Sequence, residues 1–141
     1  MKCLANHSRR ISRLGEAVLQ AGRTDEAIGL AQQALGVARH HGERGHEAYA
    51  LRLSSECALR GDDPGLAEAE TLYRHAIALA GELGMRPLLA RCRLGLGALE
   101  RRRDRLDQAG AEIRAAIQLF RSMAMRSWLE QAEAALREAG G

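Results

Sequence analysis

The chain has 141 residues, 46% of them hydrophobic and 28% charged, which is the size and balance of one ordinary globular domain. The formal net charge of +3 is too small to indicate nucleic-acid binding, and no apolar run is long enough to cross a membrane. Cys3, Cys57 and Cys92 form no CxxC pair, and residues 1–10 lack the apolar stretch of a signal peptide. We therefore expect a cytoplasmic protein with reduced cysteines.

Aromatic residues make up only 3% of the chain, and Pro64 and Pro87 are its only prolines. A core with few aromatic rings is filled by alanine and leucine, which favours closely packed helices. The scarcity of proline permits long helices, and no segment has the alternating pattern of a strand. The composition therefore predicts an all-α fold.

Alanine pairs seven residues apart recur three times, and that spacing places both members of a pair on one helix face. Successive pairs are separated by 42 and then 40 residues. The three pairs are Ala27 and Ala34, Ala69 and Ala76, and Ala109 and Ala116. They predict three repeats within a single domain over residues 1–141, at about 8–42, 43–84 and 85–125, followed by a helix at about 126–138.

In the first repeat we predict two helices separated at Gly22, with Thr24 as the N-cap of the second. Gly42 and Gly45 are predicted to break the chain after it. Helical spacing predicts two buried faces, which comprise Ile11, Leu14, Val18 and Leu19, and then Ala27, Ile28, Ala31, Ala34, Leu35 and Val37.

The second repeat is predicted to start near His46 and to turn at residues 61–64, where Asp63 can cap and Pro64 suits the first helical position. Gly84 ends this repeat, and Pro87 opens the next. The two predicted buried faces of the second repeat comprise Tyr49, Ala50, Leu53 and Cys57, and then Leu66, Ala69, Leu72, Tyr73, Ala76, Ile77 and Ala80.

In the third repeat Asp104 is predicted to cap the second helix. The two buried faces comprise Leu88, Leu89, Cys92, Leu96 and Leu99, and then Leu106, Ala109, Ile113, Ala116, Ile117 and Phe120. The final helix carries Trp128, Leu129, Ala132, Ala135 and Leu136, and we interpret it as the terminal capping helix that a helical stack requires.

These spacings resemble the tetratricopeptide repeat (TPR). The matching residues are Leu14-Gly15 with Ala27 and Ala34, Leu53-Ser54 with Ala69, Tyr73 and Ala76, and Leu96-Gly97 with Ala109 and Ala116. The small residues Gly15, Ser54 and Gly97 allow paired helices to approach closely. The resemblance implies a right-handed superhelical stack of antiparallel helix pairs, a TPR-like α-solenoid of about three repeats plus a C-terminal capping helix. The repeats are longer than the ordinary length of about 34 residues.

Segments 82–88, 91–97, 119–123 and 128–133 are similar to the C-terminal repeat region of bacterial signalling proteins. In those proteins a class III adenylate/guanylate cyclase domain and an AAA-type ATPase domain precede the repeats. The resemblance, over about residues 8–138, implies a protein-protein interaction scaffold or regulatory module of a signalling protein.

Three residues depart from the repeat pattern. Glu100 replaces an aromatic residue, Asp104 replaces the turn glycine, and Ala124 replaces the glycine before Met125. These departures affect local packing of the third repeat and leave the predicted fold class unchanged.

Stacking of this kind implies that the first helix of each repeat lines a concave groove. The implied groove residues are Arg9, Ser12, Glu16, Gln20, Leu51, Ser55, Ala58, Leu59, Arg91, Leu94, Ala98, Arg101 and Arg102. The groove would be basic at one end, because Arg101-Arg102-Arg103 is the densest charge cluster, and would suit an acidic or amphipathic peptide. A solvated surface explains the same residues equally well.

No pattern in the chain indicates catalysis or a cofactor. His40, His41 and His46 lack a metal-binding motif and fit a solvated helix end. Cys57 and Cys92 lie on apolar faces as structural cysteines, and no nucleophile-base pair is recognisable. We therefore expect no enzyme, no metal and no cofactor.

Two alternatives to peptide binding remain. Uncovered end helices could pair with a second copy, which would make self-association the function. Nucleic-acid binding through the arginine cluster is disfavoured, because no recognition motif accompanies it, and it predicts affinity that falls steeply with salt.

Overall fold

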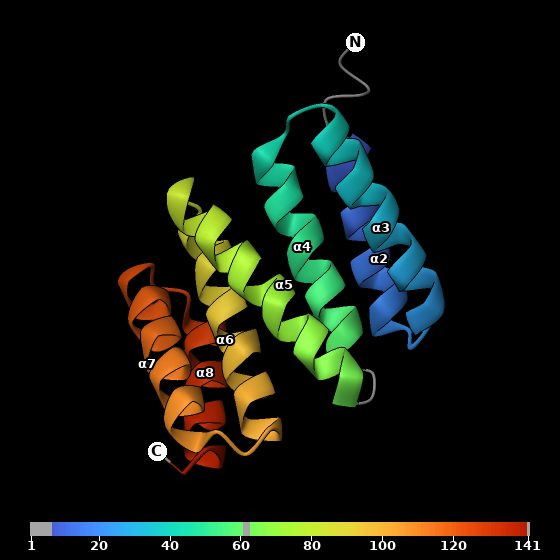
Figure 1. Ribbon diagram of the computed structural model, residues 1–141. Coiled ribbons are helices and arrows are strands. Elements are labelled where there is room, and N and C mark those ends of the chain that lie inside the picture. Colours follow the sequence, from blue (N-terminus) through green and yellow to red (C-terminus); the bar gives the residue numbers. More distant parts are fainter. Residues whose placement is uncertain (1–6, 61–62, 141) are drawn as a thin grey trace. The chain divides into compact units, whose positions relative to one another are not determined.

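The computed structural model describes residues 7–60 and 63–140, and every regular element in these ranges is an α-helix (Figure 1). The helices are α2 (His7–Gln20), α3 (Thr24–His40), α4 (Arg44–Leu59), α5 (Asp63–Glu82), α6 (Arg86–Arg102), α7 (Leu106–Ser122) and α8 (Arg126–Glu138). The predicted all-α class and the predicted seven helices with short turns are confirmed for this part of the chain. The packing of helix pairs is consistent with a helical repeat.

The chain divides into two compact units, unit 1 (Met1–Leu79) and unit 2 (Ala80–Gly141). In unit 1, helices α2, α3 and α4 all pack against one another (Figure 1). Their interfaces bury apolar side chains, among them Ile11, Val18, Leu19, Ala27, Ala31, Ala34, Ala50, Leu53 and Cys57. The predicted apolar faces therefore form the core of this unit.

In unit 2, helix α7 packs against both α6 and α8 (Figure 1). Its core contains Ala90, Ala109, Ile113, Ala116, Ile117, Phe120, Ala132 and Ala139. The Phe120 ring is stacked on the Trp128 ring of α8, with centroids 5.7 Å apart and planes inclined by 15°. This stack fixes α8 onto the end of α7.

In the described part of the chain, one turn geometry joins successive helices at five places. The second residue after the helix has a φ between 55° and 83° at each of Gly22, Gly42, Gly84, Asp104 and Ala124. The residue that follows it donates its backbone N–H to a carbonyl five residues earlier and accepts the N–H of the residue four positions later. A single residue therefore closes one helix and opens the next, in the manner of a Schellman turn.

Because one residue ends a helix and begins the next, two of the predicted N-caps are wrong. The N-cap of α3 is Arg23, so Thr24 is already helical and caps nothing. The N-cap of α7 is Arg105, because Asp104 occupies the left-handed position of the turn. Neither N-cap makes a side-chain capping hydrogen bond, since the turn itself fixes the chain direction.

Two further boundaries differ from the predictions. Gly45 does not interrupt a helix. The turn at Gly42 already separates α3 from α4, and α4 begins at Arg44, so Gly45 lies inside α4. Asp63 is the first residue of α5, and residues 61–62 of the predicted turn lie outside the described residues.

Three predicted core residues are instead exposed, namely Leu14 (55%), Ile28 (37%) and Leu106 (47%). Leu14 is turned away because Gly15 occupies the contact with α4: a Cβ at Gly15 would lie 2.5 Å from Leu53 Cδ2. Ile28 lies beside the alanine face of α3 and lines a surface hollow of unit 1. At Leu14 and Ile28 the buried positions are the adjacent residues Gly15 and Ala27, so helical periodicity gave the correct face but placed its edge one residue too far.

We expect Ala124→Gly to raise the free energy of unfolding by about 0.5–1 kcal/mol. Alanine at a φ of 55° is strained by its Cβ, and glycine relieves the strain at some entropic cost. The measurement is urea denaturation of both proteins. Gly84→Ala, at the corresponding turn with a φ of 70°, should lower stability by a similar amount. Equal stability of all three proteins would contradict this account of the turns.

Candidate functional site

Three residues of the predicted groove are buried in the structure. Ser12, Leu51 and Ser55 each have a relative exposure of 0%. The Ser55 hydroxyl donates a 2.8 Å hydrogen bond to the Leu51 carbonyl, so it is used within α4. The repeat spacing predicted that these side chains face a groove, but they lie among the packed helices and are not part of the molecular surface.

Two other predicted groove residues of unit 1, Arg9 and Glu16, make side-chain contacts within this unit. The Arg9 guanidinium lies 3.7 Å from the centroid of the Tyr49 ring. Glu16 pairs at 3.2 Å with Arg52, whose side chain is only 3% exposed and also pairs at 2.8 Å with Glu56. Sequence reasoning missed this buried arginine, which links α2 to α4. Gln20 is exposed and Leu59 and Ala58 are half-buried.

The predicted arginines of unit 2 are also engaged. Arg91 lies over Trp128, 4.9 Å from the ring centroid, and Arg101 pairs with Glu138 at 3.6 Å. Arg102 is exposed and has a partner within the fold, while Leu94 and Ala98 are half-buried, Leu94 packing against the core of the unit. Within the densest charge cluster of the sequence, Arg101 therefore links α6 to α8, and Arg102 and Arg103 also have partners within the fold.

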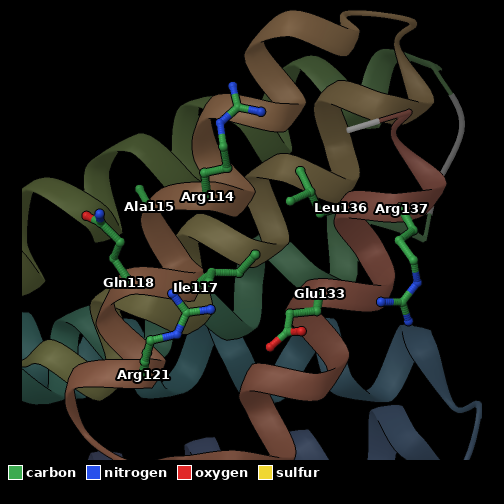
Figure 2. Close-up of a pocket in the computed structure, with 8 residues that line it drawn as sticks. All are labelled: Arg114, Ala115, Ile117, Gln118, Arg121, Glu133, Leu136 and Arg137. Atoms are coloured by element: carbon green, nitrogen blue, oxygen red, sulfur yellow. The ribbon is translucent and has the colours of Figure 1, made fainter.

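A different surface of unit 2 carries positive charge around an open hollow between α7 and α8 (Figure 2). We call it the α7–α8 hollow; its volume is about 720 Å³. Its lining residues are Arg114, Ala115, Ile117, Gln118 and Arg121 from α7, and Glu133, Leu136 and Arg137 from α8. Two apolar residues, Ile117 and Leu136, and three arginines therefore line one open hollow.

The charges of this hollow are unbalanced. None of Arg114, Arg121 and Arg137 forms an ion pair with another residue in the described part of the chain. Glu133 is the only carboxylate among the lining residues. The hollow therefore presents a net positive surface that an anionic group can neutralise.

A second hollow of about 810 Å³ lies on the other side of α7, between α7 and α6. It shares Arg121 with the α7–α8 hollow, but its other cations are used differently. Arg93 pairs with Glu112 at 2.9 Å, and Arg86 donates a 2.5 Å hydrogen bond to the Ser122 hydroxyl. The α7–α8 hollow is consequently the better candidate for an anionic ligand.

Unit 1 has a smaller hollow of about 210 Å³, which α3, α4 and α5 line with mainly apolar side chains. Cys57 lies there and is 3% exposed. Burial, with a smaller contribution from Glu56, raises the pKa of this thiol to about 11 against the opposing effect of Arg60. Cys57 is thus a protonated structural cysteine at neutral pH, and the predicted burial of Cys57 and Cys92 is confirmed.

The histidines of the α3–α4 turn make local contacts. The rings of His40 and His41 meet edge to face with centroids 5.0 Å apart, and His46 Nδ1 lies 3.2 Å from the Glu43 carboxylate. Residues 7–60 and 63–140 hold no group of three His, Cys, Asp or Glu side chains placed to bind a metal. Over the same residues, no helix combines the length and apolarity required to span a membrane.

No known protein-family model matches the chain, and no curated protein sequence matches it either. The functional interpretation therefore rests on the residues of this chain and on their arrangement. The sequence did contain a sign of the α7–α8 hollow: Arg114, Gln118 and Arg121 recur at helical spacing on α7, on the side away from the buried alanines Ala109 and Ala116.

Proposed function

We propose that this chain is a non-catalytic protein-interaction module that binds an acidic segment of another protein in the α7–α8 hollow. The observation that carries the proposal is that three arginines, Arg114, Arg121 and Arg137, line one open hollow together with apolar residues. Guanidinium groups bind carboxylates through paired, charge-assisted hydrogen bonds. Ile117 and Leu136 offer burial to an apolar side chain of the same segment.

The proposal also covers the kind of protein. We infer that the helix pairs are TPR-type repeats in a right-handed superhelix, as part of a cytoplasmic signalling protein of bacteria. The shared turn geometry and the close helix approaches at Gly15 and Gly97 support this inference. Binding another protein on an arginine-bearing surface fits a scaffold or regulatory role in such a protein.

The test is a fluorescence-anisotropy titration of the full chain with a labelled peptide rich in glutamate and leucine. We expect the peptide to bind, and the same peptide with lysine in place of glutamate to bind at least about tenfold more weakly. The protein variant Arg114→Ala/Arg121→Ala should lose about tenfold in affinity, since two ion pairs of about 0.5–1 kcal/mol each are removed.

The matched control is Arg10→Ala/Arg126→Ala, which removes the same charge from exposed arginines outside the hollow. It should bind the acidic peptide almost as the unchanged chain does. Equal losses in both double variants would show a non-specific charge effect and would overturn the proposal. So would a duplex DNA that binds at physiological salt and is released by Arg114→Ala/Arg121→Ala.

Self-association is the competing function. Light scattering across a concentration series decides it, because we expect a constant mass near 15.3 kDa. A mass that rises toward twice this value, and that Arg114→Ala/Arg121→Ala returns to the monomer, would assign the hollow to a second copy of the chain.

A further inference from the structure

The α7–α8 pair of unit 2 repeats the α3–α4 pair of unit 1. A shift of 82 residues carries Ala27 and Ala34 onto Ala109 and Ala116. The same shift carries the turn residue Gly42 onto Ala124, and both have left-handed backbone conformations. The two helix pairs therefore correspond residue by residue. The helix that packs on the α3–α4 pair consequently indicates what kind of element can pack on the α7–α8 pair.

In unit 1 a helix occupies the groove of the α3–α4 pair. Helix α5 contributes Glu68 and Leu72 to the hollow that α3 and α4 line. Its approach is close, because a Cβ at Gly65 would lie only 2.9 Å from the Ala58 carbonyl oxygen of α4. The groove of the α3–α4 pair therefore holds one helix, α5.

The α7–α8 hollow lies at the corresponding place in unit 2. The 82-residue shift carries Gln32, Leu35 and Ser54, which line the hollow of unit 1, onto residues that line the α7–α8 hollow. These counterparts are Arg114, Ile117 and Leu136. Among the described residues of unit 2, 80–140, only α7 and α8 contribute to this lining, so the hollow is a groove that no described helix fills.

The lining residues of the two hollows differ in charge. In unit 1 the neutral Gln32 and the carboxylate-bearing Glu68 line the same hollow. In unit 2 an arginine, Arg114, replaces the glutamine, with Arg121 and Arg137 nearby. A helix with glutamate at the position of Glu68 would bring a carboxylate to Arg114.

We propose that the acidic segment is an amphipathic helix of a partner protein, which docks between α7 and α8 as α5 docks between α3 and α4. This inference rests on the proposed function and names the conformation and register of the ligand. Leucine-type side chains of the helix contact Ile117 and Leu136, and a glutamate at the Glu68 position faces Arg114.

The probe is a synthetic peptide with the sequence of residues 65–82, which contains Glu68, Glu70 and Glu82. It is added to the ¹⁵N-labelled full chain and followed by NMR. We expect shifts of the backbone amides of residues 114–121 and 133–137. The same peptide with Ala69→Pro and Ala76→Pro keeps every charge but cannot form a continuous helix, and we expect its affinity to fall at least about tenfold.

Register is tested with two matched changes. Glu68→Gln in the peptide and Arg114→Gln in the protein should each weaken binding by about three- to fivefold, the value of one partly exposed ion pair. Combining them should cost no more than either alone, because both remove the same interaction. Additive losses would overturn the assigned register.

The outcomes separate this inference from the proposed function. Equal binding of the proline-containing and the unchanged peptide would overturn the helix while retaining an acidic ligand. Amide shifts confined to α3 and α4 would show displacement of α5 and would overturn the site. Binding of neither peptide, together with no binding of the glutamate-leucine peptide, would overturn both.

Discussion

Phe120→Ala is expected to lower the free energy of unfolding by about 3–5 kcal/mol, the cost of removing a large aromatic side chain from a closed core. Phe120 is fully buried and its ring is stacked on Trp128. Truncation would remove both the buried surface and the aromatic contact that joins α7 to α8, and the neighbouring helices could fill the cavity only in part.

Trp128 makes the measurement specific for unit 2, because it is the only tryptophan of the chain. Its emission can be followed through urea denaturation of the unchanged and variant proteins. Leu106→Ala is the control, since Leu106 is 47% exposed, and it should cost less than about 0.5 kcal/mol. A loss below about 1 kcal/mol for Phe120→Ala would contradict the packing of α8 on α7.

Much of the helical framework follows from local sequence. Six alanines at repeated positions, from Ala27 to Ala116, are fully buried as their spacing predicts. Glycines that allow a left-handed backbone mark the ends of α2, α3 and α5 correctly. These features are local, because a periodic face and a turn residue act over a few residues of chain.

The incorrect predictions arise where one local rule competes with another. Thr24 has a good capping side chain, but the turn at Gly22 already makes Arg23 the N-cap. Asp104 likewise occupies the left-handed position that glycine fills elsewhere, which aspartate tolerates better than most residues. Cap propensity alone could not reveal that one residue would serve two helices.

The candidate site was less predictable than the fold. Whether an arginine is available depends on carboxylates and rings that are distant in sequence, as Glu138 is from Arg101 and Trp128 is from Arg91. The sequence pattern did not predict Arg114 as a binding residue, although no described carboxylate pairs with it. Three-dimensional neighbours therefore decide which cations hold the fold together and which can bind a ligand.

Gly97→Ala is expected to lower the free energy of unfolding by about 2 kcal/mol, although alanine is the better helix former. A Cβ at Gly97 would lie 2.5 Å from Ile113 Cγ1 and 3.3 Å from the Ala109 carbonyl oxygen of α7. Ile113 is fully buried and its branched side chain has one strongly preferred helical rotamer, so it has no room to turn away. The two helices must separate instead, which disrupts the packing of α6 on α7.

The matched control is Gly36→Ala on α3, where an added Cβ meets nothing within 4 Å. The same chemical change should there raise stability by about 0.5–1 kcal/mol, because only the helix preference acts. Urea denaturation of both variants measures the difference in sign. If both substitutions stabilised the chain, the close approach of α6 and α7 at Gly97 would be wrong. Opposite signs would show that the recurring glycine in the first helix of a repeat is required by the distance between helices, since helix preference alone favours alanine at both positions.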